Sequence, residues 1–136
     1  MRQLLLLFAL VAYGSSHAGG ICSSDFKSFI SRFEASPELQ LSQTKFPLTY
    51  RYVDHDDPDM KMKRMIVQKN DQAKYLTFPS LAYQRKLKLN RKLNSIKSNK
   101  CSVVFNAPDS DMYDVEFKFE HQAGKWLLVE VENNSL

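Results

Sequence analysis

The sequence lacks the motifs by which most hydrolases are recognised. It contains neither a nucleophile elbow nor a metal-protease motif. A hydrolase needs a nucleophile with a base within reach, and beyond the N-terminal segment the only histidines, His55 and His121, fall in predicted turns. We therefore predict no catalytic residues, no metal and no cofactor. For acid/base chemistry the first candidates would be Tyr50, Tyr52, Asp54 and His55.

Long apolar runs and strong charge of one sign are also missing. After the N-terminus no apolar run approaches the roughly 20 residues that span a bilayer, so we expect no transmembrane segment. The formal net charge is only +4, which is too small by itself to indicate nucleic-acid binding. No internal repeat or low-complexity tract occurs.

The N-terminus has the pattern of an export signal over residues 1–18. Arg2 supplies a minimal positive charge, Leu4 to Ala12 is an apolar stretch too short to cross a bilayer, and Ser16-His17-Ala18 fits the small-x-small cleavage rule. The alternative is an apolar N-terminal core helix. Export predicts a periplasmic or secreted protein whose residues 19–136 form one domain.

Only two cysteines occur, Cys22 and Cys101, and both follow the export signal. In an oxidising compartment an even pair predicts one disulfide, which would tie the new N-terminus to the rest of the domain. Closing so long a loop would stabilise the protein by roughly 4 kcal/mol on the chain-entropy model. The alternative, a cysteine-based metal site or a catalytic thiol, lacks a cluster of partner residues.

The first half of the sequence predicts helices followed by a strand. Phe26, Phe29, Ile30 and Phe33 recur at helical spacing and form one apolar stripe. Ser36-Pro37-Glu38 has the residues of a second helix start, which predicts a short helix over 39–43. Phe46-Pro47-Leu48 is expected to end that helix and to lead into a strand over 49–53.

The C-terminal stretch predicts an antiparallel hairpin. Tyr113, Val115, Phe117 and Phe119 alternate with charged residues, as in a strand with one buried face. Residues 121–124 supply a turn, and the return run 125–132 is expected to place Leu127, Val129 and Val131 on one face, opposite Glu130 and Glu132. Trp126 and Leu128 make this strand apolar on both faces near the turn.

Further strands are predicted over 62–68 and 101–105, while residues 75–78 are read as a strand or a loop. Two helical segments before the first strand indicate an α+β fold and not a parallel β-α-β sheet. We therefore predict N-terminal helices packed on a curved antiparallel sheet.

The element order resembles a known family. The helix over Phe26 to Phe33, the segment 39–43, the Phe46-Pro47-Leu48 corner and a terminal hairpin containing Lys125-Trp126-Leu127-Leu128 look like the exported bacterial proteins of domain of unknown function 4348. That family is similar to the nuclear transport factor 2-like superfamily, in which helices and a curved sheet form a cone. The resemblance implies a concave pocket and no catalytic residues.

The segment 54–59 concentrates four aspartates and His55 in six residues. Hard cations bind oxygen ligands, but the spacing lacks the glycine and the distal glutamate of a calcium loop. We interpret it mainly as a polar turn between strands, in which Pro58 fixes the backbone.

The segment 84–100 is strongly basic and contains no acid. Leu89, Leu93 and Ile96 have helical spacing, whereas Leu87 and Leu89 also fit a strand start, so the two readings stay open. Such a block favours an acidic protein or an anionic surface. The predicted partner-binding residues are Arg85, Lys86, Lys88, Arg91 and Lys92.

Two functional hypotheses follow. The first is an exported, non-enzymatic protein of the bacterial envelope that binds a protein partner, as an inhibitor or an immunity protein does. The second is a small-molecule-binding or weakly catalytic protein that uses a cavity between the first helix and the sheet. Its candidate cavity residues are Tyr50, Tyr52 and Tyr113. A peripheral role at an anionic membrane surface is a third, weaker hypothesis, resting on the basic block alone.

Overall fold

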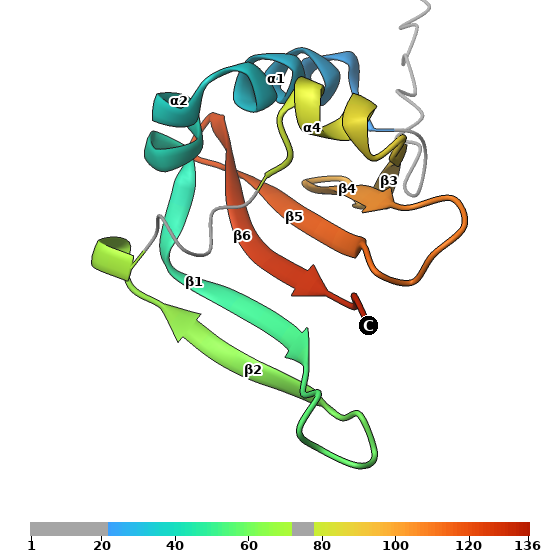
Figure 1. The fold of residues 1–136 in the computed structure, drawn as a ribbon. Coiled ribbons are helices and arrows are strands. Elements are labelled where there is room, and N and C mark those ends of the chain that lie inside the picture. The colour runs from blue at the N-terminus through green and yellow to red at the C-terminus, as the bar shows by residue number, and fades with distance from the viewer. Residues whose placement is uncertain (1–21, 72–77) are drawn as a thin grey trace, which may run out of the picture.

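The structure is a computed structural model in which residues 22–71 and 78–136 are described (Figure 1). The predicted export signal and residues 75–77 lie outside the described residues. The helices are α1 (Ser24–Ala35), α2 (Pro37–Ser42) and α4 (Leu81–Lys86), with one short 3-10 helix, η1 (Lys69–Asp71). The strands are β1 (Thr44–Val53), β2 (Met62–Val67), β3 (Asn90–Lys97), β4 (Lys100–Asn106), β5 (Asp114–Gln122) and β6 (Lys125–Asn133).

The six strands form one sheet in the order β2-β1-β6-β5-β4-β3. Every neighbouring pair is antiparallel except β1 and β6, which run parallel. Figure 1 shows α1, α2 and α4 together over one end of the sheet, while the β1–β2 hairpin extends away from them. The α+β class is confirmed. The sheet is mixed at one pair, and α4 lies between β2 and β3, so the helices are not all N-terminal.

Helix α1 forms where the apolar stripe predicts it and closes one face of the sheet. Its N-cap residue Ser23 accepts a hydrogen bond from the backbone N–H of Phe26 at 3.3 Å. Burying each large apolar side chain of its stripe contributes about 2 kcal/mol. The four stripe residues are all buried, namely Phe26, Phe29, Ile30 and Phe33.

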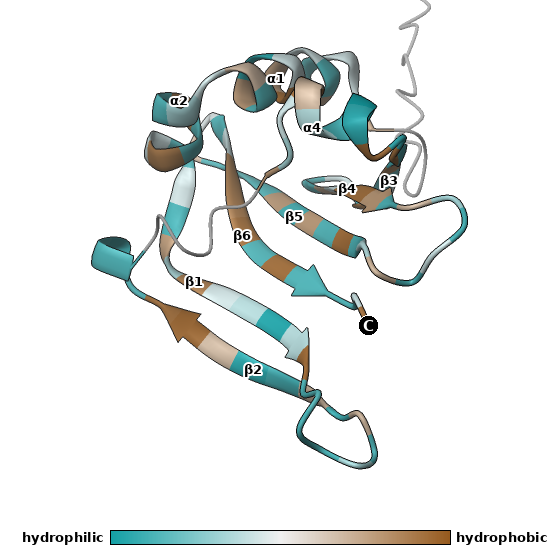
Figure 2. Ribbon diagram, viewed as in Figure 1, coloured by the Kyte–Doolittle hydropathy of each residue, from teal (hydrophilic) through white to brown (hydrophobic). Residues whose placement is uncertain are grey.

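The sheet face that packs under α1 is built from alternate residues of five strands. Figure 2 shows apolar and polar residues alternating along β5 and β6. The buried residues on this inner face include Leu48, Val67, Val103, Phe105, Val115, Phe117, Phe119, Leu128 and Val131. Phe78 also packs into this core, with its ring centroid 4.7 Å from that of Phe117.

The predicted facing of β6 is wrong in the first part of the strand, where Trp126 and Leu128 are buried and Leu127 and Val129, expected on one face with Val131, are not. A register shift between Lys118 and Phe119 pairs these residues with Glu130 and Leu128, which leaves Val129 as an extra residue on β6. Leu128 therefore faces the core together with Val131. Strict alternation would place two residues three positions apart on opposite faces. The sequence showed the apolar residues on both sides of this strand but not the bulge that explains them.

Two other boundaries differ from the prediction. Phe46 and Pro47 lie inside β1, which already begins at Thr44, and do not precede it. The helix read from the spacing of Leu89, Leu93 and Ile96 does not form, because Leu93 and Ile96 lie in β3, which begins at Asn90. The helix α4 lies earlier and ends at Lys86. The chain reverses direction between α4 and β3, over residues 87–89.

The disulfide is confirmed. Cys22 and Cys101 are bonded, with a Cα–Cα distance of 6.1 Å and a sequence separation of 79 residues. Both are buried at the edge of the core, at 5% and 3% exposure. The bond therefore ties the segment before α1 to β4. Within the described residues no helix is long and apolar enough to cross a membrane.

Candidate functional site

A cavity of about 390 Å³ opens at the end of the sheet that lies away from the helices. We call it the tyrosine pocket. It lies where the ends of β1 and β6 meet the start of β2 and the loop after β1 (Figure 1). Its lining residues are Tyr50, Tyr52, Val53, His55, Met65, Asn133 and Ser135.

The tyrosine pocket continues the inner, core-facing side of the sheet. Tyr50 and Tyr52 follow the buried Leu48 at two-residue spacing on β1, and Asn133 follows the buried Val131 on β6. The parallel pairing places Tyr52 directly beside Asn133. Since α1 covers only the first part of this face, its far end is left to form a pocket.

Hydrogen bonds fix the β6 side of the pocket. The Asn133 side-chain amide donates to the Tyr50 hydroxyl at 3.1 Å, and its carbonyl oxygen accepts from the backbone N–H of Ser135 at 3.0 Å. The Ser135 hydroxyl in turn accepts from the backbone N–H of Asp114 at 3.0 Å. The segment after β6 is thereby held against β5, so the pocket wall is preorganised.

The two pocket tyrosines lie near each other. Their ring centroids are 6.2 Å apart with a tilt of 39°. Tyr113, the third predicted cavity residue, is not among the residues that line this pocket. It is half-buried and packs against Tyr83 with ring centroids 6.1 Å apart. Burial, together with the neighbouring Tyr83 and Tyr50, raises the pKa of Tyr113 to about 12. Tyr113 therefore stays a neutral phenol at physiological pH.

The acidic segment 54–59 forms the loop between β1 and β2 at the mouth of the pocket. Asp54 forms an ion pair with Lys63, and its carboxylate also accepts from the backbone N–H of Asp56 at 3.1 Å. The hydrogen bond with Lys63 lowers the pKa of Asp54 and raises that of Lys63. Among residues 22–71 and 78–136 no group of three or more metal-ligating side chains converges. The contacts of Asp54 hold this loop in place, and the loop positions His55 in the lining of the pocket.

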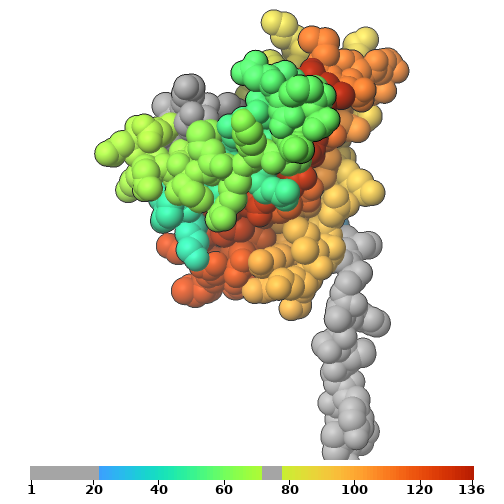
Figure 3. Space-filling view, turned by 90° about the horizontal axis from the view of Figure 1, so that it is seen from below, coloured from blue at the N-terminus to red at the C-terminus, as the bar shows by residue number. Residues whose placement is uncertain are grey.

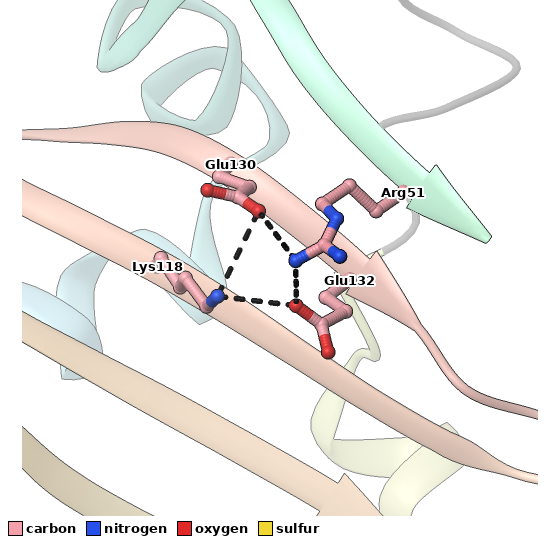
Figure 4. Close-up of polar contacts among 4 residues, drawn as sticks. All are labelled: Arg51, Lys118, Glu130 and Glu132. Atoms are coloured by element: carbon pink, nitrogen blue, oxygen red, sulfur yellow. Dashed lines mark hydrogen bonds and ion pairs between the residues drawn. The ribbon is translucent and has the colours of Figure 1, made fainter. Parts of the chain in front are cut away.

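The outer face of the sheet carries a compensated charge cluster (Figure 4). Arg51 contacts Glu132 at 3.1 Å and Glu130 at 3.9 Å, and Lys118 contacts the same two carboxylates at 3.1 and 3.7 Å. Burial alone would lower the pKa of Lys118, but the hydrogen bond to Glu132 and the nearby carboxylates raise it. Burial alone would raise the pKa of Glu132, but the hydrogen bond with Lys118 and the nearby cations lower it.

This outer face is not covered by the N-terminal helices. In Figure 3, seen from below, β6 is visible between the β1–β2 hairpin and the β3–β4 hairpin, and no atoms of α1 or α2 appear. Because the two cations and two carboxylates of the cluster neutralise each other, the cluster itself offers no net charge to a partner.

The structure separates the five predicted partner-binding residues. Arg91 faces the helices and contacts Glu34 of α1 at 3.5 Å; the same carboxylate accepts from Gln84 at 3.1 Å. Lys92 belongs to the opposite sheet face, since it pairs with Val104 and Arg91 with the buried Phe105. The other three, Arg85, Lys86 and Lys88, lie exposed on α4 and the turn that follows it.

Sequence reasoning singled out Tyr50, Tyr52 and His55 but missed the rest of the lining. Asn133 and Ser135 follow the predicted return strand 125–132 and were not among the candidate site residues. Only the parallel pairing of β1 with β6, which no local pattern encodes, places Asn133 beside the tyrosines. Met65 was noted as part of a methionine-rich stretch, and its pairing with Tyr50 was not foreseen.

Comparison with solved structures relates the fold to known proteins. A nuclear transport factor 2-like protein from Bacteroides fragilis superposes with a TM-score of 0.60 at 14% identity, covering 82% of this chain and 47% of that chain. A domain of unknown function with a cystatin-like fold from Nostoc punctiforme gives a TM-score of 0.46 at 9% identity, covering 85% and 80%. The chain therefore spans about half the length of the Bacteroides protein.

No model of a known protein family matches the sequence, and no curated protein matches it either. The chain is thus similar in fold to a nuclear transport factor 2-like protein, and at 14% identity that similarity shows the fold alone. Membership of the family of domain of unknown function 4348 remains an expectation from the sequence.

Proposed function

We propose that this protein binds a small, uncharged, ring-containing ligand in the tyrosine pocket. The observation that carries the proposal is the composition of the lining. It combines aromatic faces, hydroxyls and one amide, and none of the described lining residues is a lysine, arginine, aspartate or glutamate. A cavity of about 390 Å³ falls within the usual range for small-molecule sites.

The lining suits a ligand with a flat or puckered ring and hydroxyl groups at its rim. Tyrosine rings offer apolar faces for stacking and hydroxyls at their ends. The Ser135 hydroxyl and the Asn133 amide add polar groups that hydrogen bonds already hold in place. A charged ligand would lose hydration at this site without meeting an opposite charge in the described lining, so neutral ligands are favoured.

The fold is compatible with this proposal, because the curved sheet leaves part of its inner face free of helix. We propose binding only and assign no reaction to this pocket. His55 is the lining residue with a side chain suited to proton transfer, but it is exposed on the loop between β1 and β2.

A ligand screen by thermal shift and ligand-observed NMR would test the proposal. The library should contain neutral sugars and phenols with matched carboxylate and amine derivatives. We expect saturable binding by neutral members, weakened at least tenfold by Tyr52→Ala and by Asn133→Ala. Tyr83→Ala is the matched control, because Tyr83 is 43% exposed and is not among the lining residues. Equal binding in wild type and the two pocket variants would refute the proposal.

A second candidate function is the binding of an acidic protein partner, the exported inhibitor or immunity role predicted from the sequence. The observation in its favour is a mixed surface on α4 and its following turn. Three apolar side chains there are unusually exposed, Leu81 at 45%, Tyr83 at 43% and Leu87 at 36%. They lie next in sequence to the exposed cations Arg85, Lys86 and Lys88. Exposed apolar patches mark interaction sites, and arginine is enriched in protein interfaces.

The two candidates can be separated by affinity purification. The disulfide-bonded protein would be used as bait in envelope and secreted extracts, beside a variant with Arg85→Glu, Lys86→Glu and Lys88→Glu. A stoichiometric partner that the variant loses supports protein binding. Lys92→Glu is the control, because Lys92 belongs to the other sheet face. Retention of every partner by the triple variant would refute this role for the α4 surface.

A further inference from the structure

A second cavity, independent of the tyrosine pocket, lies where α1, the end of α2 and the β5–β6 turn meet. We call it the helix–hairpin pocket. Its volume is about 150 Å³. The lining residues used below are Asp25, Phe29, Arg32, Gln43, Lys125 and Trp126.

The walls of the helix–hairpin pocket come from three segments that are firmly joined. Asp25, Phe29 and Arg32 recur at helical spacing on one face of α1. The Trp126 indole N–H donates to the Asp25 carboxylate at 3.0 Å, which links β6 to α1. The backbone N–H of Leu128 donates to the carbonyl of Gln43 at 2.8 Å, which links β6 to the end of α2.

The tight turn before β6 brings Lys125 to the same opening. Ala123 and Gly124 both have positive φ, at 48° and 80°, as a two-residue hairpin turn requires. The turn therefore folds back sharply and places Lys125 and Trp126 against the helices. The floor is apolar and rigid, because Phe29 and Trp126 are only 5% and 6% exposed.

The three charged residues that line this pocket, Asp25, Arg32 and Lys125, are solvent-exposed and form no ion pairs with one another. Arg32 and Lys125 line the same cavity as Asp25, yet within the described part of the chain neither cation has a carboxylate oxygen within 4.0 Å. Asp25 accepts one hydrogen bond, from Trp126 to one of its two oxygens. Two cations and one carboxylate thus surround a small space without neutralising each other, unlike the compensated cluster on the outer sheet face.

We propose that the helix–hairpin pocket binds a small zwitterion of the amino-acid class. Its carboxylate would lie between Arg32 and Lys125, which donate charge-assisted hydrogen bonds, and its ammonium would donate to the free oxygen of Asp25. A simple anion is disfavoured by the Asp25 carboxylate, and a simple cation by the two basic residues. The volume limits the ligand to a small side chain, with alanine as the probe.

The single tryptophan of the chain makes the test specific, because Trp126 lies in this pocket. The indole N–H resonance of the full disulfide-bonded protein would be followed while alanine is added to millimolar concentration. Propionate, which lacks the ammonium, and ethylamine, which lacks the carboxylate, serve as matched probes. We expect a saturable shift with alanine and at least tenfold weaker binding of the other two.

Variants test separately the residues that would bind the carboxylate and the ammonium of the ligand. Arg32→Gln should weaken alanine at least tenfold, whereas Lys27→Gln, an exposed lysine on the same helix, should not change it. Asp25→Asn retains an oxygen for the Trp126 indole and should make alanine and propionate bind alike. Tyr52→Ala, in the other pocket, should have no effect. Absence of a saturable shift, or equal shifts with alanine and propionate in the wild-type protein, would overturn the proposal.

Discussion

Removal of the disulfide gives the sharpest test of how the fold is held together. The bond joins Cys22 to Cys101 across a sequence separation of 79 residues. On the chain-entropy model, opening a loop of that length costs about 4.5 kcal/mol of folding free energy. Domains of this size have unfolding free energies of about 5–15 kcal/mol. We therefore expect the double variant Cys22→Ala and Cys101→Ala to lose a third or more of its stability.

Urea unfolding followed by Trp126 fluorescence would measure the effect. With a slope of about 2 kcal/mol per molar urea, the midpoint should fall by about 2 M. Alanine is chosen because serine would bury two hydroxyls in the core. Ser102→Ala is the control, since Ser102 adjoins Cys101 and its hydroxyl is fully buried with no hydrogen-bond partner among the described residues. Loss of an unsatisfied hydroxyl should leave the midpoint unchanged or raise it.

A fall of less than about 1 kcal/mol in the double variant would refute the reasoning. It would mean that the unfolded chain between the two positions is already compact without the bond, or that the bonded native state carries strain that offsets the gain. The slope distinguishes these two explanations, since a more compact unfolded state lowers it.

Three further predictions follow from the ionisable groups. In an absorbance titration Tyr113, whose pKa is raised to about 12, should give an ionisation step near that pH, and Tyr113→Phe should remove the step. Burial, with the carboxylates nearby, raises the pKa of Asp114, so its ionisation destabilises the fold as pH rises; Asp114→Asn should raise the melting temperature at pH 7 but not below pH 3.8. Lys118→Met should cost about 1 kcal/mol at pH 7. Because the pKa of Glu132 is lowered in the fold, its stabilisation is present above pH 4.5, so this cost should disappear as the solution becomes acidic.

Local sequence patterns predicted the helices and strands that bury one regular face. The stripe of α1 and the alternation of β5 follow from spacing alone, because burial of one face imposes a period of 3.6 or 2.0. The disulfide followed from compartment and count. Helix and strand could not be separated in advance for the basic segment, because Leu89, Leu93 and Ile96 recur at helical spacing although Leu93 and Ile96 lie in the strand β3.

The candidate sites were less predictable because they depend on contacts between distant segments. The Glu34 carboxylate, 7% exposed in its side chain, neutralises Arg91 from α1, a contact across more than fifty residues of sequence. The basic segment therefore looked like one surface although the fold divides it. Asn133 reaches the tyrosine pocket only through the parallel pairing of β6 with β1. In the second pocket, Asp25 accepts a hydrogen bond from Trp126, which lies 101 residues away in the sequence.

The bulge at Val129 connects these observations. Before it, Trp126 and Leu128 face the helices, where Trp126 binds Asp25 and closes the helix–hairpin pocket. After it, Val131 and Asn133 take over the inner face, and Asn133 reaches the tyrosine pocket. Without the extra residue, a strand that buried Trp126 and Leu128 would turn Asn133 to the outer face, since facing alternates strictly. The one irregularity in β6 thus allows a single strand to contribute to a pocket at each end.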